Sequence, residues 1–253
     1  EYQIEPMLTL YHFTQPQWFM EKGGFEKAEN IPLFVNYVKH VVTHLSPWVN
    51  RWCTINEPAV EAFSGYLYGQ FPPHQCLQFT KAAIVLKHLL MAHMQAYEAV
   101  FNFLNKEALF GIVHNMLRFE SRSALIRKVV TEPLTRFTDE VVMGFLADGH
   151  FDYRGVHYHD DRPRGNCSFM NIYGDVQIGY FGPTCQKHQL MGDMYIAIYP
   201  ESYAKALERA SQLNLPVYIT ETGIADASDN LRQVYVLQFL QEVLNAVAKG
   251  QDI

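Results

Sequence analysis

The sequence predicts an α/β fold in which parallel strands alternate with helices, as in a (β/α)8 barrel. Five apolar stretches of strand character alternate with five segments of helical periodicity. This alternation implies parallel strands joined by right-handed crossovers. The strands end on polar residues and no G-x-G-x-x-G loop follows an early strand, so a barrel fits better than a doubly wound sheet. We expect residues 1–253 to form one partial barrel domain.

The first two strands are separated by one helix. Residues 5–13 form an apolar run that meets a polar side chain at His12, which predicts a strand. Residues 31–45 carry apolar side chains at helical spacing. Residues 51–57 favour a buried strand, and Pro58 cannot continue its hydrogen-bond ladder.

The middle of the chain repeats the alternation after a loop. Glycines and prolines at positions 65–73 predict a long loop directly after Glu57. Residues 80–104 form a strongly periodic helix, and residues 110–115 form a strand that ends on an amide. Residues 123–146 are helical in pattern, with a proline interrupting them.

The last part of the chain contains two strands and two helices. Residues 149–165 are polar and irregular and residues 179–192 are rich in turn residues, so we expect loops there. The remaining expected elements are strands at 168–173 and 217–221 and helices at 201–213 and 231–248.

Composition narrows the class of protein. A hydrophobic content of 49% with 18% charged residues is globular, and the net charge of -6 argues against nucleic acid or an anionic membrane as partner. The sequence has no apolar run long enough to span a bilayer. The four cysteines are scattered, as in a reduced cytoplasmic protein rather than a disulfide framework: Cys53, Cys76, Cys167 and Cys185.

Two glutamates stand at strand ends and dominate the chemistry. Glu57 ends the run R-W-C-T-I-N-E-P, and Glu221 ends the run P-V-Y-I-T-E. In parallel α/β folds the carboxyl ends of strands carry the ligand site. A pair of carboxyl groups facing one another is the equipment for cleaving a glycosidic bond. A solvated carboxylate at a strand end is the structural alternative for either glutamate alone.

Several segments together resemble glycoside hydrolase family 1, the retaining β-glucosidases and β-galactosidases. In chain order the resembling segments are Met7–Phe13 with Gln15–Trp18, T-I-N-E-P at 54–58, Asn171-x-Tyr173, Y-P-E at 199–201 and I-T-E-T-G at 219–223. The resemblance implies a TIM barrel of which this chain covers about five βα units, strands 3–7. Strands 1, 2 and 8 of the family have no counterpart here.

The resemblance also implies roles for individual residues. Glu57 is implied to be the general acid/base and Glu221 the nucleophile, and no cofactor is needed. Asn56 is implied to bind the 2-hydroxyl of the sugar, and His12 a neighbouring hydroxyl. The Tyr173 hydroxyl is implied to contact the nucleophile. Asn115 and Asn171 complete the expected substrate-binding set for a β-glucoside or β-galactoside. His12 could equally be a core histidine, and Asn115 could satisfy loop backbone.

Two departures from the family pattern shape the expectations. Thr222 stands where the family usually has asparagine, and a β-branched residue tolerates strained backbone poorly. A five-strand arc also leaves two open edges with unpaired backbone groups. We therefore expect either that the chain is a fragment of a longer one, or that another molecule, including a second copy, covers the edges.

Two other functions remain open. Loss of the missing strands favours a carbohydrate-binding or interaction module with impaired turnover. The run His157-x-His159-Asp160-Asp161 offers metal-ligating side chains, but it lacks a helical i, i+4 spacing, so we expect no metal site. Trp18, Tyr66 and Tyr68 could stack on a sugar or simply pack in the core.

Overall fold

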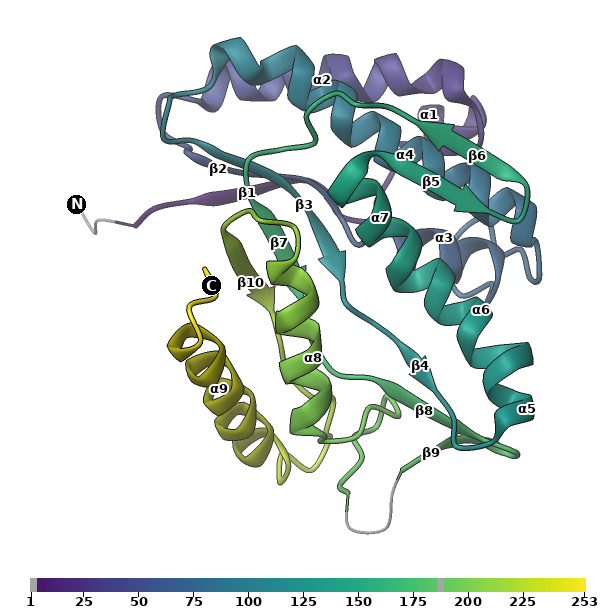
Figure 1. Ribbon diagram of the computed structural model, residues 1–253. Coiled ribbons are helices and arrows are strands. Elements are labelled where there is room, and N and C mark those ends of the chain that lie inside the picture. Colours follow the sequence, from purple (N-terminus) through teal and green to yellow (C-terminus); the bar gives the residue numbers. More distant parts are fainter. Residues whose placement is uncertain (1–3, 186–188) are drawn as a thin grey trace. The chain divides into compact units, whose positions relative to one another are not determined.

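The computed structural model describes residues 4–185 and 189–253. Five strands form a sheet in the order β1-β2-β3-β7-β10, and β1, β2 and β3 pair in parallel (Figure 1). Their bounds are β1 (Met7–Tyr11), β2 (Arg51–Asn56), β3 (Leu109–Asn115), β7 (Ser168–Asn171) and β10 (Val217–Glu221). All five predicted strands are confirmed, in an open arrangement that corresponds to part of a barrel.

The backbone divides into two compact units. The first comprises Glu1–His114 and Gly144–Phe169, and the second comprises Asn115–Met143 and Met170–Ile253. The division falls within β3 and within β7, so both units contain residues of these two strands. Each unit is described below by itself.

Helices cover the strands of the first unit. The predicted helices 31–45 and 80–104 appear as α2 (Ile31–Leu45) and α4 (Phe79–Val100), which pack against each other. Two fully buried side chains, Trp52 from β2 and Leu89 from α4, lie in this core, where the free thiol of Cys53 is also buried. Short helices complete this part: α1 (Gln17–Glu21), η1 (Gly24–Glu26), η2 (Ala28–Asn30) and η3 (Phe101–Phe103).

The segment after Glu57 is a helix where we predicted the start of a loop. Helix α3 (Pro58–Tyr66) begins at the proline, whose fixed φ suits the first helical position and whose missing N–H is not needed there. The prediction gave too much weight to the turn residues at 65–73. The loop begins only after Tyr66.

Residues 149–165 contain a β-hairpin, so the prediction of a loop there is wrong. Strands β5 (His150–Tyr153) and β6 (Val156–His159) pair antiparallel. Arg154 and Gly155 form the two-residue connection, both with positive φ (47° and 80°), as a type I′ turn requires.

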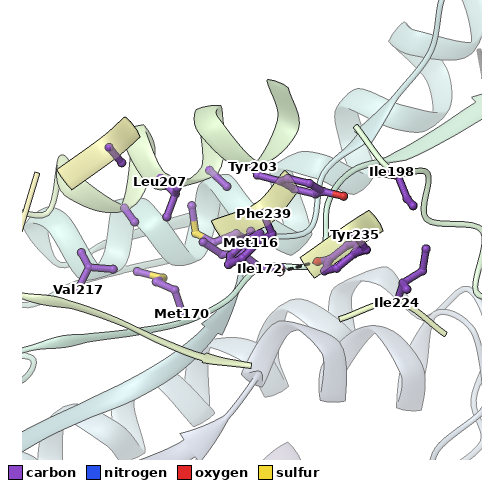
Figure 2. Packing of buried hydrophobic residues seen from close by; sticks show 13 residues of the cluster. Met116, Met170, Ile172, Ile198, Tyr203, Leu207, Val217, Ile224, Tyr235 and Phe239 are labelled. Atoms are coloured by element: carbon purple, nitrogen blue, oxygen red, sulfur yellow. Dashed lines mark hydrogen bonds between the residues drawn. The ribbon is translucent and has the colours of Figure 1, made fainter. Parts of the chain in front are cut away.

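The second unit is built around an apolar cluster under two helices. Helices α8 (Pro200–Ser211) and α9 (Arg232–Ala248) pack together, and the predicted helices 201–213 and 231–248 are confirmed. Figure 2 shows Tyr203, Tyr235 and Phe239 from these helices beside Ile172 and Met170. The Tyr235 hydroxyl donates to the Ile172 carbonyl oxygen at 3.2 Å, so the core contains one anchored polar group.

A small three-stranded sheet in the second unit was not predicted. Strand β4 (Phe119–Glu120) pairs parallel with β8 (Val176–Gly179), which pairs antiparallel with β9 (Gly182–Thr184). The predicted loop at 179–192 is therefore wrong over β9. Residues 186–188 of that prediction lie outside the described residues.

The helical pattern at 123–146 is confirmed as one helical segment with two π-helical stretches. The segment consists of α5 (Ala124–Ile126), η4 (Arg127–Thr131), α6 (Glu132–Thr135), η5 (Arg136–Glu140) and α7 (Val141–Asp148). The expected interruption by Pro133 is a local change of winding between the π stretches, and the chain does not leave the helical path. No helix within the described ranges has the length and apolar character needed to cross a membrane.

Candidate active site

One group of predicted site residues lies in the first unit, at the carboxyl ends of β1 and β2. Glu57 follows β2 with its backbone in the left-handed region, at φ 45° and ψ 62°. Holding a non-glycine residue there costs about 1–3 kcal/mol, which the surroundings must offset. The Glu57 N–H donates to the Val113 carbonyl oxygen at 2.9 Å, and Pro58 then starts α3. The strand thus turns sharply into a helix at the glutamate.

Asn56 and His12 lie beside this turn. The Asn56 side-chain amide donates to Nε2 of His12 at 3.2 Å, because an amide nitrogen can only donate. Asn56 and Glu57 are buried, whereas His12 is exposed. The structure therefore brings together three of the predicted site residues, and His12 is not a core histidine.

A second carboxyl group lies close to Glu57, four residues further along the chain. Glu61 on α3 is buried, and its Oε1 accepts from the Tyr11 hydroxyl at 2.6 Å and from the Gln15 amide at 2.9 Å. Burial raises the pKa of Glu61 to about 7. The sequence analysis missed this group. Its only local signal is the i, i+4 spacing from Glu57, which places both residues on one side of the first helical turn.

A separate group of predicted site residues lies in the other unit, at the carboxyl ends of β7 and β10. The Tyr173 hydroxyl donates to Oε2 of Glu221 at 2.7 Å. The Glu221 carbonyl oxygen accepts from the Ile172 N–H at 3.0 Å, which fixes the backbone of the glutamate. Glu221 itself is exposed. The Tyr173 hydroxyl therefore orients the Glu221 carboxylate, which remains accessible to solvent.

Thr222 fits its position without backbone strain. It is not among the described residues with positive φ, and its hydroxyl donates to the Ile172 carbonyl oxygen at 2.7 Å. The Tyr235 hydroxyl lies 2.9 Å from the Thr222 hydroxyl oxygen and 3.1 Å from the Tyr173 carbonyl oxygen. The threonine therefore ties the segment after Glu221 to the segment that carries Tyr173.

The two predicted asparagines lie near one another in the second unit. Asn115 at the end of β3 and Asn171 at the end of β7 are both buried, and the Met116 N–H donates to the Asn171 carbonyl oxygen at 3.0 Å. Oδ1 of Asn171 accepts from the Thr220 hydroxyl at 2.7 Å. This bond gives Asn171 a structural role alongside any role in binding.

An ionic cluster supports the segment that carries Tyr173. The buried Asp139 carboxylate lies 2.8 Å from Arg118 and 3.3 Å from Arg209. Asp175, two residues after Tyr173, is also buried, and burial raises its pKa to about 7. Two arginines and two buried acidic residues from separate segments thus interact next to the segment that carries Tyr173.

The side chains considered for a metal site are engaged in pairs along the β5–β6 hairpin. His157 lies 3.1 Å from Asp152, and His159 lies 3.1 Å from Asp161. Asp160 pairs with Arg162, whose hydrogen bonds hold the pKa of that carboxyl well below its usual range. In the part of the chain that the structure describes, no group of three histidine, cysteine or acidic side chains is arranged to hold a metal ion.

The three aromatic residues considered for sugar stacking differ in exposure. Tyr66 is buried and its hydroxyl donates to Oε1 of Glu26 at 3.0 Å, so it packs in the core. Trp18 and Tyr68 are exposed, at 51% and 66%. Only these two could stack on a ligand.

Comparison with known proteins matches residues 1–158 to the sequence model of glycosyl hydrolase family 1. The 6-phospho-β-galactosidase 1 of Streptococcus pneumoniae (strain R6) is 32% identical over 70% of this chain and 38% of its own length. The rice (Oryza sativa subsp. japonica) protein β-glucosidase-like SFR2, chloroplastic, is 24% identical over 99% of this chain and 38% of its own length. A solved β-glycosidase from Pyrococcus horikoshii matches with a TM-score of 0.83 and 30% identity, over 98% of this chain and 60% of that one. The chain thus spans less than two thirds of the length of these relatives.

Proposed function

Because this chain belongs to glycosyl hydrolase family 1, we propose that it acts as a retaining exo-β-glycosidase on terminal β-linked glucosyl or galactosyl residues. The observation that carries the proposal is the pair of glutamates at strand ends. Glu57 follows β2 beside Asn56 and His12, and Glu221 ends β10 against Tyr173. The names of the relatives support a β-linked hexose as substrate.

The reaction proceeds by double displacement. Glu57, as the carboxylic acid, donates its proton to the glycosidic oxygen while an oxygen of Glu221 attacks the anomeric carbon and the aglycone leaves. Glu57, now a carboxylate, takes a proton from water, which attacks the anomeric carbon and releases Glu221. The two inversions give net retention. This mechanism requires the carboxyl groups to lie about 5–5.5 Å apart.

The surrounding residues orient the reacting groups. The Tyr173 hydroxyl occupies Oε2 of Glu221, so we assign the attack to Oε1. Asn56 and His12 are hydrogen-bonded to each other, and a sugar hydroxyl placed between them could bond to both. Asn115 and Asn171 are the further proposed substrate contacts, and no cofactor takes part.

Hydrolysis of aryl β-glycosides tests the proposal. We expect turnover of 4-nitrophenyl β-glucoside or β-galactoside, with the β-anomer of the sugar formed first in the NMR spectrum. Glu57→Gln and Glu221→Gln should lower kcat by on the order of 10²–10⁴-fold or more, because each removes a reacting group. Glu208→Gln, on the exposed side of α8, is the matched control and should leave turnover unchanged. Initial release of the α-anomer would rule out the retaining mechanism.

The leaving group separates the two glutamates. A 2,4-dinitrophenyl glycoside needs little protonation of its leaving oxygen. Glu57→Gln should therefore slow the first step much less with this substrate than with an alkyl glycoside. Glu221→Gln should be equally defective with both substrates. The opposite pattern would exchange the two assigned roles.

A carbohydrate-binding module with impaired turnover is the second candidate function. The exposure of Glu221 favours it, because a carboxylate open to water is a weaker nucleophile than a shielded one. Saturable binding of a β-glucoside without any hydrolysis by the chain would support this candidate. Turnover that depends on both glutamates would eliminate it.

A further inference from the structure

The buried carboxyl of Glu61 has no part in the proposed reaction, yet it is costly to keep in place. It lies on α3 with two hydrogen-bond donors, Tyr11 and Gln15, on the same oxygen. Its other oxygen, Oε2, is buried with no hydrogen-bond partner in the structure, and so is Oε1 of Gln15. Leaving such atoms unpaired destabilises a fold, so an apolar residue here would be the more stable choice.

The groups around Glu61 come from three directions. Tyr11 comes from the end of β1, Gln15 from the following turn, and Tyr66 from α3 itself. The Tyr66 hydroxyl is bonded to Glu26, which places one further carboxylate in the neighbourhood. With its raised pKa, the Glu61 carboxyl is largely neutral below pH 7, and a neutral carboxyl resembles a carboxamide in size and shape.

The Glu61–Tyr11 bond connects the segment that carries His12 with the segment that carries Asn56 and Glu57. Tyr11 directly precedes His12, which is bonded to Asn56. On the helix side, the Glu61 N–H donates to the Glu57 carbonyl oxygen at 3.1 Å, as the first hydrogen bond of α3. The bond therefore links the end of β1 to the first turn of α3, immediately after the left-handed residue Glu57.

We propose that Glu61 is a positioning residue that, through its hydrogen bond to Tyr11, fixes the backbone turn at Glu57 relative to His12 and Asn56. The inference rests on the proposed function, in which Glu57 is the acid/base. The left-handed backbone of Glu57 requires support on both sides. Val113 bonds its N–H on the strand side, and the Glu61–Tyr11 bond holds the helix side. This role explains why a buried carboxyl that destabilises the fold is present at this position.

The same helix provides a matched control. Tyr66, in the last turn of α3, makes a tyrosine–glutamate hydrogen bond of the same kind, at 3.0 Å to Glu26. Both tyrosines are buried. Tyr11→Phe removes the hydroxyl bonded to the first turn of α3, and Tyr66→Phe removes an equivalent hydroxyl from its last turn, away from Glu57.

The test compares kcat, KM and unfolding for these variants of the full chain. Both should lower stability to urea by similar amounts, but only Tyr11→Phe should lower kcat, by about 10–100-fold with KM little changed, because the acid/base is displaced rather than the sugar contacts. Glu61→Ala should match Tyr11→Phe, and the double variant should be no worse than either single one. Glu61→Gln should restore kcat to within about 3-fold of the wild type, since the amide oxygen still accepts from Tyr11. Equal kcat for Tyr11→Phe and Tyr66→Phe would overturn the inference.

A measurement without substrate separates this inference from the proposed function. If the wild type shows no turnover, the proposed function fails. Hydrogen exchange at the Glu61 backbone amide then still reports whether the Glu61–Tyr11 bond stabilises the first turn of α3. Tyr11→Phe should then raise that exchange rate about 10-fold, while Tyr66→Phe leaves it unchanged. Equal exchange rates in the two variants would by themselves contradict the inference that the Glu61–Tyr11 bond fixes this turn.

Discussion

Buried His93 should make the stability of the protein depend on pH in a way that a single substitution removes. Its Nε2 lies 2.7 Å from the Arg164 carbonyl oxygen and its Nδ1 lies 2.7 Å from the Thr54 hydroxyl. Because a carbonyl only accepts, Nε2 carries the proton and Nδ1 accepts from Thr54. Burial lowers the pKa of His93 from 6.5 to about 4.

The size and sign of the effect follow from that shift. Below pH 6.5 the unfolded chain binds a proton at His93 that the folded chain refuses until about pH 4, so stability falls as pH falls through this window. Each pKa unit is worth about 1.4 kcal/mol, which gives a loss of about 2 kcal/mol between pH 7 and pH 4.5. Above pH 6.5 the contribution is fully present.

Two buried acids act in the opposite direction, so the comparison must be differential. Burial raises the pKa of Glu61 and of Asp175 to about 7, which stabilises the fold at low pH and withdraws that stabilisation as pH rises from about 4 to 7. Their contribution is common to the wild type and to His93→Gln. The difference between these two proteins therefore isolates His93.

The assay is urea unfolding of both proteins at pH 7 and pH 4.5. The wild type should lose about 2 kcal/mol more than His93→Gln over this interval. His40→Gln, at an exposed histidine on α2, should follow the wild type. If the wild type and His93→Gln lost the same free energy of unfolding between these pH values, the conclusion that the buried His93 imidazole stays neutral would be refuted.

Three further substitutions have defined outcomes. Asp139→Ala should lower the free energy of unfolding by about 3 kcal/mol in urea, because it removes the buried carboxylate that pairs with both Arg118 and Arg209 and leaves Arg118 paired with the exposed Glu140. Tyr173→Phe should lower kcat/KM about 10-fold, which corresponds to about 1.4 kcal/mol, because it removes the hydrogen bond that orients the exposed carboxylate of Glu221. Gly111→Ala should cost about 1–3 kcal/mol in thermal unfolding, because a Cβ would meet the carbonyl oxygen of Cys167, the residue before β7, at 2.8 Å. An unchanged unfolding midpoint for Asp139→Ala or Gly111→Ala would contradict the contact assigned to that residue. An unchanged kcat/KM for Tyr173→Phe would contradict the role of its hydrogen bond.

The sheet strands and long helices could be predicted because their apolar patterns are long and uninterrupted. The predicted helix 31–45 coincides with α2, and the predicted strand 217–221 coincides with β10. Errors arose where turn residues lie close to a regular element. Pro58 was taken as the end of a strand, which it is, but the same residue also starts α3.

The sequence of the β5–β6 hairpin contains a strand pattern, but the polar composition of the segment was given more weight in the prediction. Phe151 and Tyr153 are buried while His150 and Asp152 are exposed, an alternation typical of a strand with one buried face. The polar residues on the exposed face made the segment look irregular. The two-residue turn with a glycine between alternating runs was the decisive feature.

The Glu61–Tyr11 contact could not be predicted, because its partners are 50 residues apart and the apolar run that contains Tyr11 predicts a strand but not the partner of its hydroxyl. By contrast, the contact of Tyr173 with Glu221 followed from the resemblance to the family. Local patterns predict where strands end. They do not predict which buried polar groups meet once the strands are paired.

Covalent trapping tests the central assignment most directly. A 2-deoxy-2-fluoro-β-glycoside with a good leaving group should form a glycosyl-enzyme that hydrolyses very slowly, because fluorine destabilises the oxocarbenium-like transition state. We expect one label per chain, located by peptide mass spectrometry on Glu221 and lost in Glu221→Gln. A chain that turns over substrate but carries the label on another residue, or carries none, would contradict the account.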